Sequence, residues 1–378
     1  MPLTLLILGG YGTFGGRLAR LLANEPRLNL VLAGRSRAKA EAFCTALPPG
    51  AGRAALALDR DGDLDAALAA AAPDMVIDAS GPFQAYGERP YRVAEACVAR
   101  GIDYLDLADG TGFVIGISAL DAAARAAGVS VLSGVSSVPA LSGAAVRRLA
   151  RGMAEVRTIR GGIAPSPHAR VGLNVVRALA SYAGRPVALA RDGRAGEGGA
   201  LTETLRYEIG LPGHVSLGPR LFSLVDVPDL QLFPGEWPGL CSVWFGAGPT
   251  PEPFHRAFIA LAWLVRLGLI PTLEPLAGLF HAAVNVFAWG AHRGGMFMEV
   301  DGLAPDGRSL RRSWRLIAEG DDGPFIPAMA AEAIVRRRLQ GLRPAPGARP
   351  AIRELELDDF APAFARRRIF TGVLDHPE

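Results

Sequence analysis

The fold of this chain is decided by one short stretch, Leu8-Gly9-Gly10-Tyr11-Gly12-Thr13-Phe14-Gly15. The apolar run Leu3–Leu8 predicts a buried strand before it, and the periodic leucines that follow predict a helix after it. Gly10, Gly12 and Gly15 thus form a G-x-G-x-x-G motif between a strand and a helix. There, the first glycine makes a tight turn, the second admits a pyrophosphate, and the third lets helix and strand pack closely. The stretch predicts a dinucleotide-binding turn, in which backbone N–H groups and the helix dipole hold the phosphates.

The end of the second predicted strand indicates which dinucleotide binds. An NAD site places Asp or Glu about 20 residues after the glycines, where it holds the ribose 2′-hydroxyl. This chain instead carries Arg35-Ser36-Arg37, whose guanidinium groups and hydroxyl suit a 2′-phosphate. Alternatively, Ser36 caps the helix that starts at Arg37 and the arginines are solvated, and both interpretations can hold together. We therefore predict NADP(H) rather than NAD(H) as the cofactor.

Strand and helix signals alternate through the first third of the chain. Six short apolar runs, each followed by a helical pattern, begin at Leu3, Leu30, Ala54, Met75, Tyr104 and Val129. Strands with helices on both sides are buried on both faces, which explains their solid apolar character. The pattern predicts an α/β fold whose N-terminal Rossmann domain, a doubly wound parallel sheet, covers residues 1–137. We expect a second α+β domain for substrate binding and dimerisation over residues 138–322, and a C-terminal segment over 323–378.

The second domain is less regular in pattern. Met296–Val300 and Ser309–Ile317 alternate around a glycine-containing turn and predict a β-hairpin. Arg191–Gly199 is rich in glycine and arginine and predicts a turn, while Arg343–Pro350 is typical of a linker. Residues 254–289 are mostly apolar, but Arg266, Pro271, Glu274 and His281 interrupt them before about 18 apolar residues accumulate. This stretch predicts a buried helical hairpin; the alternatives are a lid over an apolar substrate and a contact with a membrane surface.

Composition narrows the class of protein. The net charge of +3 is too small and too dispersed to indicate nucleic acid binding. The three cysteines, Cys44, Cys97 and Cys241, form no C-x-x-C pair, which favours a reducing compartment and a cytoplasmic location. The six histidines show no metal-binding spacing, so no metal site is expected. The N-terminal run lacks a basic region before it and indicates a first strand rather than a signal peptide.

Candidate site residues follow the predicted strands, because ligands bind at the carboxyl ends of such sheets. Tyr86 could protonate a reduced product, and Asp109 could serve as acid, base or anchor for an amine; alternatively, Tyr86 packs in a loop and Asp109 forms a turn. His292 is a third candidate proton donor, and Arg170, Asn174 and Arg293 are candidate substrate anchors. The residues expected to contact the cofactor are Gly10, Tyr11, Gly12, Thr13, Phe14, Gly15, Arg35, Ser36, Arg37, Asp59, Ser80, Gly81 and Pro82.

With these residues identified, the chain resembles the saccharopine dehydrogenase/reductase-like family of NAD(P)-binding oxidoreductases. The resemblance rests on the glycine stretch, on Ala79–Phe83 with Tyr86-Gly87, on Gly101–Leu107 and on Gly323-Pro324. It implies an N-terminal NADP-binding domain, a second domain that holds the substrate, and a helix after Gly323 that packs back on the first domain. In saccharopine-forming members, the residue before the proline that follows the sixth strand is acidic. Here Val138 precedes Pro139, which argues against opine chemistry on amino acids.

The sequence thus predicts an NADP-dependent oxidoreductase that transfers hydride to or from an imine, a carbonyl or an activated alkene. The substrate is expected to be small or hydrophobic, and the protein to form a homodimer. Two alternatives stay open. One is a membrane-associated reductase of lipid intermediates, for which the apolar stretch 254–289 would suit a lipid-like substrate. The other is a non-catalytic NADP-binding sensor.

Overall fold

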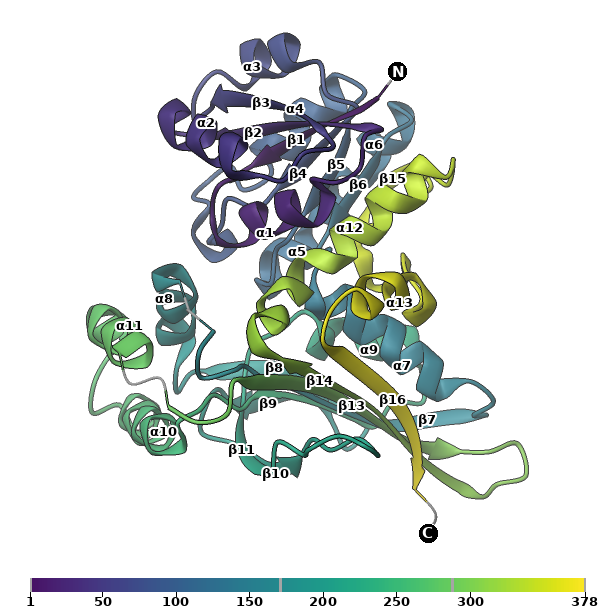
Figure 1. Cartoon of the computed structure of the whole chain (residues 1–378). Coiled ribbons are helices and arrows are strands. Elements are labelled where there is room, and N and C mark those ends of the chain that lie inside the picture. The colour runs from purple at the N-terminus through teal and green to yellow at the C-terminus, as the bar shows by residue number, and fades with distance from the viewer. Residues whose placement is uncertain (1, 170–171, 287–288, 377–378) are drawn as a thin grey trace. The chain divides into compact units, whose positions relative to one another are not determined.

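A computed structural model describes residues 2–169, 172–286 and 289–376 of the chain (Figure 1). The contacts divide it into two compact units. The first unit comprises Met1–Leu141 and Phe325–Leu355, and the second comprises Ser142–Pro324 and Glu356–Glu378. The boundary predicted after residue 137 lies close to the first division. The predicted C-terminal segment 323–378 is shared, because its residues from 356 onward join the second unit.

The first unit is built on a seven-stranded parallel sheet in the order β15-β6-β5-β4-β1-β2-β3. The strand order reverses between β1 and β4, and such a switch point is where doubly wound sheets bind their ligands. This is the predicted Rossmann-type sheet. Its strands are β1 (Leu3–Leu8), β2 (Leu28–Gly34), β3 (Gly52–Ala57), β4 (Met75–Asp78), β5 (Asp103–Asp106), β6 (Ser130–Ser133) and β15 (Gly347–Pro350).

Helices bury the sheet of the first unit. Leu6 and Leu8 of β1 pack in one apolar cluster with Leu64 and Leu68 of α3 and Val93 of α4, which is why the strand is a solid apolar run. On the chain's return, α12 packs against α1 (Figure 1). The helices of this unit are α1 (Thr13–Leu22), α2 (Arg37–Ala46), α3 (Leu64–Ala71), α4 (Arg92–Ala99), α5 (Thr111–Gly116), α6 (Asp121–Ala126) and α12 (Ile326–Leu339).

The seventh strand, β15, corrects the prediction of a linker over Arg343–Pro350. The Gly347 N–H donates to the Val129 carbonyl at 2.9 Å, and the Ala348 N–H donates to Asp121 Oδ1 at 2.9 Å. Arg343 holds the start of this segment through Asp103, with N–O distances of 2.9 and 2.6 Å. A four-residue strand that begins with glycine and ends with proline carries no apolar run, so its pairing depends on contacts distant in sequence.

The second unit is an α+β structure built on a mixed seven-stranded sheet in the order β10-β11-β12-β7-β13-β14-β16. Its strands are β7 (Glu155–Ala164), β10 (Thr204–Glu208), β11 (Pro219–Leu224), β12 (Ser242–Ala247), β13 (Arg293–Leu303), β14 (Ser309–Glu319) and β16 (Ile369–His376). The predicted hairpin is confirmed as β13 and β14, which pair antiparallel along their whole length. The helices are α7 (Ser142–Ala150), α8 (Leu173–Tyr182), α9 (Asp229–Glu236), α10 (Glu252–Arg266), α11 (Ala277–Val286) and α13 (Leu357–Ala365).

Two predictions for the second unit were wrong in part. The expected turn over Arg191–Gly199 is mostly strand, because β8 (Pro186–Arg191) and β9 (Arg194–Gly199) form a hairpin around Asp192-Gly193. Both turn residues have positive φ, 51° and 73°, as a type I′ hairpin turn requires. The apolar stretch does form two helices, α10 and α11, but one face of each is exposed rather than buried. No helix in the described ranges is long and apolar enough to cross a bilayer.

Candidate functional site

The glycine stretch forms the turn between β1 and α1, at the switch point of the first sheet. Gly9 has a φ of +74°, and a Cβ at this position would lie 2.8 Å from the Ala79 carbonyl oxygen at the end of β4. A Cβ on Gly10 would lie 3.1 Å from the Leu32 Cα of β2, and one on Gly15 only 2.3 Å from the Gly9 carbonyl oxygen. The glycines therefore let the turn run close to both neighbouring strands, and the positive φ falls on Gly9 rather than on Gly10.

Free backbone donors lie at the start of α1. Gly12 is its N-cap residue and has no side chain with which to cap the helix. Within the described residues, the N–H groups of Thr13, Phe14 and Gly15 have no hydrogen-bond acceptor, and Gly12 and Thr13 are exposed. Unpaired N–H groups at a helix N-terminus favour an anion. The turn therefore fits the pyrophosphate of a dinucleotide.

Tyr11 connects this turn to the end of β2. Its phenolic oxygen accepts a hydrogen bond from the Ser36 N–H at 2.9 Å. Its ring lies over Gly34, where a Cβ would stand 2.6 Å from a ring carbon. Ser36 Oγ accepts from the Lys39 N–H at 3.4 Å, which caps α2. The capping interpretation of Ser36 is thus confirmed.

The two arginines beside Ser36 differ in their surroundings. Arg37 forms an exposed ion pair with Glu41, with Nε 2.8 Å from Oε1. Arg35 is exposed, and within the described ranges its guanidinium group has no hydrogen bond or ion pair. Arg35 is therefore the available cation at the position where the ribose of the dinucleotide is expected. Asp59, which follows β3, is also exposed and accepts a hydrogen bond from the Asp61 N–H at 3.1 Å.

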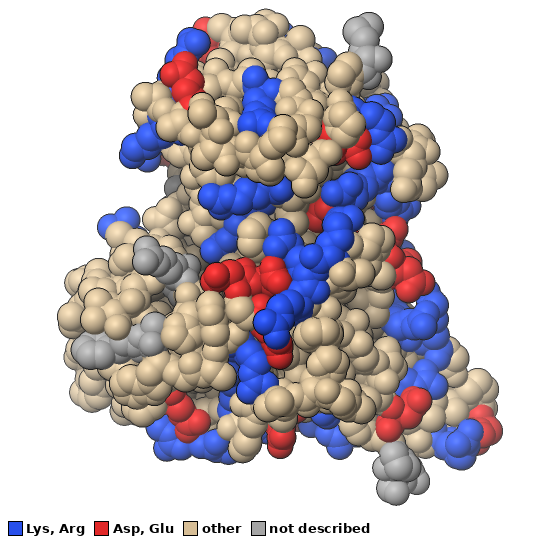
Figure 2. Space-filling view, viewed as in Figure 1, with Lys and Arg blue, Asp and Glu red and all other residues tan. Residues whose placement is uncertain are grey.

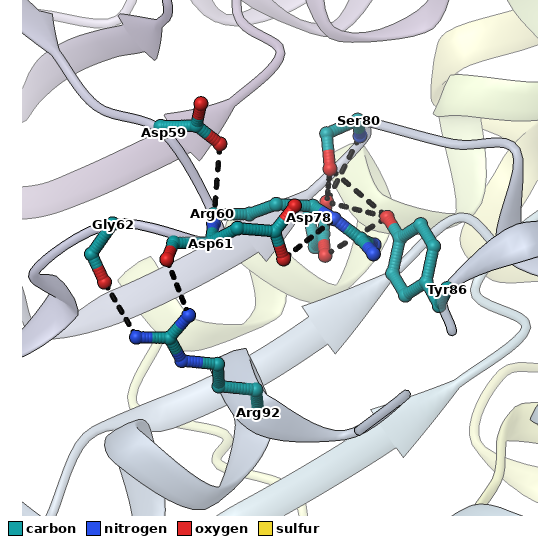
Figure 3. Close-up of polar contacts among 8 residues, drawn as sticks. All are labelled: Asp59, Arg60, Asp61, Gly62, Asp78, Ser80, Tyr86 and Arg92. Carbon is teal, nitrogen blue, oxygen red and sulfur yellow. Dashed lines mark hydrogen bonds and ion pairs between the residues drawn. The ribbon is translucent and has the colours of Figure 1, made fainter. Parts of the chain in front are cut away.

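A buried network stands at the carboxyl end of β4 (Figure 3). Oδ1 of Asp78, a fully buried residue, accepts hydrogen bonds from the Ser80 N–H at 2.9 Å and the Ser80 hydroxyl at 2.6 Å. The Tyr86 hydroxyl lies 2.9 Å from Ser80 Oγ and 3.3 Å from Asp78 Oδ2. The Arg60 guanidinium carbon lies 3.3 Å from the centroid of the Tyr86 ring. These contacts fix the loop that contains Ser80, Gly81 and Pro82.

Burial dominates the electrostatics of this network. It raises the pKa of Asp78, while the hydrogen bonds from Ser80 and the charge of Arg60 act in the opposite direction. Burial, and then the Asp78 carboxyl, also raise the pKa of Tyr86 well above its ordinary value. Tyr86 is 7% exposed. The contacts of Tyr86 therefore favour the second interpretation from the sequence, packing in a loop, because its phenol donates to Asp78 and holds the loop.

The end of β5 carries a second buried carboxyl beside the first. Asp106 lies in register with Asp78 on the neighbouring strand. Its Oδ1 accepts hydrogen bonds from the Gly134 N–H, the Ala108 N–H and the Ser133 hydroxyl, at 2.9, 3.0 and 2.9 Å. Burial raises the pKa of Asp106 to about 7. The carboxyl therefore anchors the turn after β6 to the end of β5.

Asp109 lies on the same edge as the Ser80 loop. It is exposed, and its Oδ1 accepts a hydrogen bond from Gln84 Nε2 at 3.0 Å. This bond joins the loops that follow β4 and β5, as expected from the strand order. Asp109 thus presents an exposed carboxyl beside the loop that is expected to hold the nicotinamide.

The other candidate residues belong to the second unit. His292 is partly exposed, with Nε2 3.3 Å from Asp321 Oδ1 and its ring centroid 4.7 Å from that of His168. Arg293 donates to the carbonyl oxygens of Val215 and Ser216 at 2.5 and 3.4 Å. Asn174 is exposed near the start of α8. Arg170 lies outside the described residues.

Sequence reasoning missed three members of the first-unit site. Asp78 is the last residue of an otherwise apolar strand. An acidic residue at the carboxyl end of such a strand could have identified it as a site residue. Arg60 carries no such signal, because its contact with Tyr86 joins loops that are 26 positions apart. Gly9 was counted as part of the motif, but no pattern distinguished it as the glycine with positive φ.

Comparison with known proteins agrees with this geometry. Residues 5–132 match the family model described as the saccharopine dehydrogenase NADP binding domain. The match confirms the resemblance predicted from the sequence for this part of the chain. No curated protein matches the sequence.

Two solved structures align with this chain over nearly its whole length. Saccharopine dehydrogenase (L-Glu forming) from Saccharomyces cerevisiae is 14% identical, with 99% of this chain and all of that chain covered and a TM-score of 0.65. GenD2 from gentamicin A biosynthesis, solved in complex with NAD, is 13% identical, with 100% and 97% covered and a TM-score of 0.43. The yeast enzyme establishes the α/β fold for the whole chain, and the family match and this fold together support an oxidoreductase.

Proposed function

From a dinucleotide-binding domain of the saccharopine dehydrogenase type, we propose that this protein is an NADP(H)-dependent oxidoreductase. The observation that carries the proposal is the glycine turn, whose free N–H groups at the start of α1 suit a pyrophosphate. The unpaired guanidinium group of Arg35 supports a 2′-phosphate and hence NADP(H) over NAD(H). The three free thiols support a reducing, cytoplasmic environment.

In this proposal, separate groups of residues bind the cofactor, hold the loop beside it and exchange a proton. The bound cofactor would supply or accept the hydride at an imine, carbonyl or activated alkene. The glycine turn, Tyr11 and Arg35 would bind its phosphates and adenosine ribose. The Asp78 network holds the Ser80-Gly81-Pro82 loop in place, and the exposed carboxyl of Asp109 is the group best placed on this edge to exchange a proton.

Turnover separates this proposal from a non-catalytic sensor. We would mix the full chain and NADPH with panels of cyclic imines, ketones and enoyl esters, and follow the absorbance of the reduced nicotinamide. The proposal expects substrate-dependent NADPH oxidation by at least one panel, and its loss in Gly15→Ala. NADPH binding without oxidation across all panels would favour the sensor.

A second candidate function, reduction of lipid intermediates at a membrane, is favoured by the surface of α10 and α11. The residues exposed along α10 include Ala257, Ala260, Trp263 and Leu264, and those along α11 include Leu279 and Val286. Figure 2 shows that the surface over this helix pair is mostly uncharged. Exposed apolar stripes with tryptophan at their margins suit the interface of a lipid bilayer. Exposed apolar side chains also lie in the segments that follow each helix. We define the apolar helix face as the exposed residues of both helices and these segments: Trp263, Leu264, Leu267, Leu269, Leu276, Leu279, Val286 and Trp289.

Vesicle binding tests this candidate. The wild-type chain should co-sediment with phosphatidylcholine vesicles, and the double variant Leu267→Glu/Leu279→Glu should stay in the supernatant. Leu342→Glu is the matched control, because it adds the same charge at an exposed leucine of the first unit. Wild-type protein that remains in the supernatant at every lipid concentration would exclude the membrane function and leave the oxidoreductase proposal intact.

A further inference from the structure

Basic side chains gather at one end of the sheet in the second unit, where β7 ends and β13 begins. His168 follows β7, and its ring centroid lies 4.7 Å from that of His292, just before β13. Arg293 is the first residue of β13. Arg220, at the start of β11, donates to the Pro165 carbonyl oxygen at 3.4 Å, in the turn that leads to His168. We call His168, Arg220, His292 and Arg293 the basic cluster.

No carboxylate in the described residues pairs with either arginine of this cluster. Glu319, directly across from Arg293 in the β13–β14 register, pairs with Arg368 instead. Glu208 accepts a hydrogen bond from the Ser216 hydroxyl at 2.6 Å. Asp321 is the acid beside His292, but its side chain is 92% exposed. The positive charge of the cluster is therefore poorly neutralised by the protein.

Arg220 and Arg293 are also partly buried. Burial lowers the pKa of Arg220, and the neighbouring charge of Arg293 lowers it further. Holding two guanidinium groups close together without an acid costs stability, and such an arrangement is typical of a site that binds an anion.

Hydrogen-bond donors remain available in the cluster. A guanidinium group has five N–H donors, of which the carbonyl contacts use one on Arg220 and two on Arg293. His292 Nε2 is not counted among these donors, because it is buried and lies 3.3 Å from Asp321 Oδ1. The unused guanidinium donors match the oxygens of a carboxylate or phosphate, with which they form charge-assisted hydrogen bonds.

The basic cluster borders the apolar helix face. His168 Nε2 lies 3.0 Å from the Gly290 carbonyl oxygen, next to Trp289. The Trp289 ring centroid lies 5.9 Å from that of Phe254 on α10. A ligand whose anionic group binds the cluster can therefore lay an apolar chain along α10 and α11.

We propose that the basic cluster binds the carboxylate or phosphate of an amphiphilic substrate whose apolar chain contacts the apolar helix face. The inference rests on the proposed function, since it names the class of substrate for that oxidoreductase. It assigns to Arg220 and His168 a binding role that the sequence pattern did not indicate.

Binding of simple amphiphiles to the full chain tests this inference. Calorimetric titrations with octanoate, acetate and 1-octanol separate the contributions of the anion and of the chain. We expect octanoate to bind more tightly than either of the other two. Arg220→Leu should weaken octanoate binding by roughly tenfold, which corresponds to about 1.4 kcal/mol, and leave 1-octanol unchanged. Arg220→Lys should retain part of the affinity, because it keeps the charge but loses the fork of donors.

Arg308→Leu is the matched control, since Arg308 lies at the far tip of the same β13–β14 hairpin and is paired with Asp306. It should bind octanoate as the wild type does. Unchanged octanoate binding in both Arg220→Leu and Arg293→Gln would overturn the inference, as would equal affinities for octanoate and acetate. A parallel NADPH titration separates the two proposals: absent NADPH binding contradicts the oxidoreductase, whereas normal NADPH binding without octanoate binding contradicts only the basic cluster.

Discussion

The phenolic oxygen of Tyr11 accepts a hydrogen bond from the Ser36 N–H at 2.9 Å, and this one bond joins the glycine turn to the turn after β2. The first turn carries the free donors for a pyrophosphate, and the second carries Arg35. The Tyr11 ring also lies over Gly34, and the Gly10 N–H donates to the Ala33 carbonyl at 3.0 Å, so two neighbouring residues of the glycine turn set the spacing between these elements. The proposed cofactor site is thus preorganised by contacts within the first unit.

Tyr11→Phe should weaken this connection without removing the ring. The Ser36 N–H loses its acceptor, so we expect the free energy of unfolding to fall by about 1 kcal/mol and NADPH affinity to fall a few-fold. Chemical denaturation and fluorescence titration measure the two effects. Tyr11→Ala, which also removes the ring, should be worse in both. Equal NADPH affinity in all three proteins would show that Tyr11 does not position the site.

Gly15→Ala should disrupt the turn, because the added Cβ would lie 2.3 Å from the Gly9 carbonyl oxygen. Relieving that clash requires a backbone shift, so we expect a loss of about 1–3 kcal/mol in the free energy of unfolding. NADPH affinity should also fall, since the free N–H groups move with the backbone. Gly112→Ala is the control, because a Cβ on Gly112 of α5 meets no atom within 4 Å. Equal stability and equal NADPH affinity of the two variants would contradict the close approach of Gly15 to the Gly9 carbonyl.

The sequence predicted the first unit better than the second. Five of the six strands from Leu3 to Ser133 were identified because their burial leaves solid apolar runs between helices. The sixth, β3, is the edge strand and has no buried residue, but its alanine and leucine side chains still formed an apolar run. β15 was missed, since Gly347–Pro350 has no such run and is held by Asp121 and Val129, both distant in sequence. For α10 and α11 the sequence favoured a buried hairpin and left a lid or a membrane contact as alternatives, because an apolar pattern alone does not distinguish a buried helix from a surface one.

Sequence analysis identified site residues only where they belong to a short motif that is continuous in the sequence. The glycine turn and the Arg35-Ser36-Arg37 segment were identified from their positions after β1 and β2. The distinction between the paired Arg37 and the unpaired Arg35 depends on where Glu41 lies on α2, which only the structure gives. The Asp78 network and the basic cluster join residues from separate loops, so no spacing in the sequence marks them.

Tyr86→Phe tests whether the buried phenol holds a loop or transfers a proton. We expect unfolding free energy to fall by about 1 kcal/mol, because the hydroxyl donates to Asp78, and turnover to change less than about tenfold. Asp109→Asn should instead lower turnover by about a hundredfold if the exposed carboxyl exchanges the proton. Both are measured with a substrate from the panels. The reverse pattern would identify Tyr86 as the proton donor.

The stability of the protein should depend on pH through Asp106. Burial raises the pKa of Asp106 from 3.8 to about 7. Between these values the unfolded chain releases the proton while the folded chain keeps it. The free energy of unfolding therefore falls as pH rises, by up to about 1.4 kcal/mol per pH unit, and this contribution levels off above about pH 7.

Asp106→Asn removes this titration and should make the decline between about pH 4 and pH 7 shallower. Part of the decline should remain, because burial also raises the pKa of Asp229 to about 7. Urea denaturation at a series of pH values measures it. Asp61→Asn, at a side chain that is 73% exposed, is the control and should keep the wild-type slope. A slope that is the same in the wild type and Asp106→Asn would mean that Asp106 is ionised in the folded protein throughout this range.

The most direct test of the central claim is the titration of the purified full chain with NADPH and with NADH, followed by cofactor fluorescence and repeated for Arg35→Ala. We predict that the wild type binds NADPH more tightly, and that Arg35→Ala loses roughly tenfold or more of NADPH affinity while NADH affinity stays unchanged. Arg37→Ala should have a smaller effect, because Arg37 is paired with Glu41. Failure of the wild type to bind either dinucleotide, or an equal loss of both in Arg35→Ala, would contradict the account.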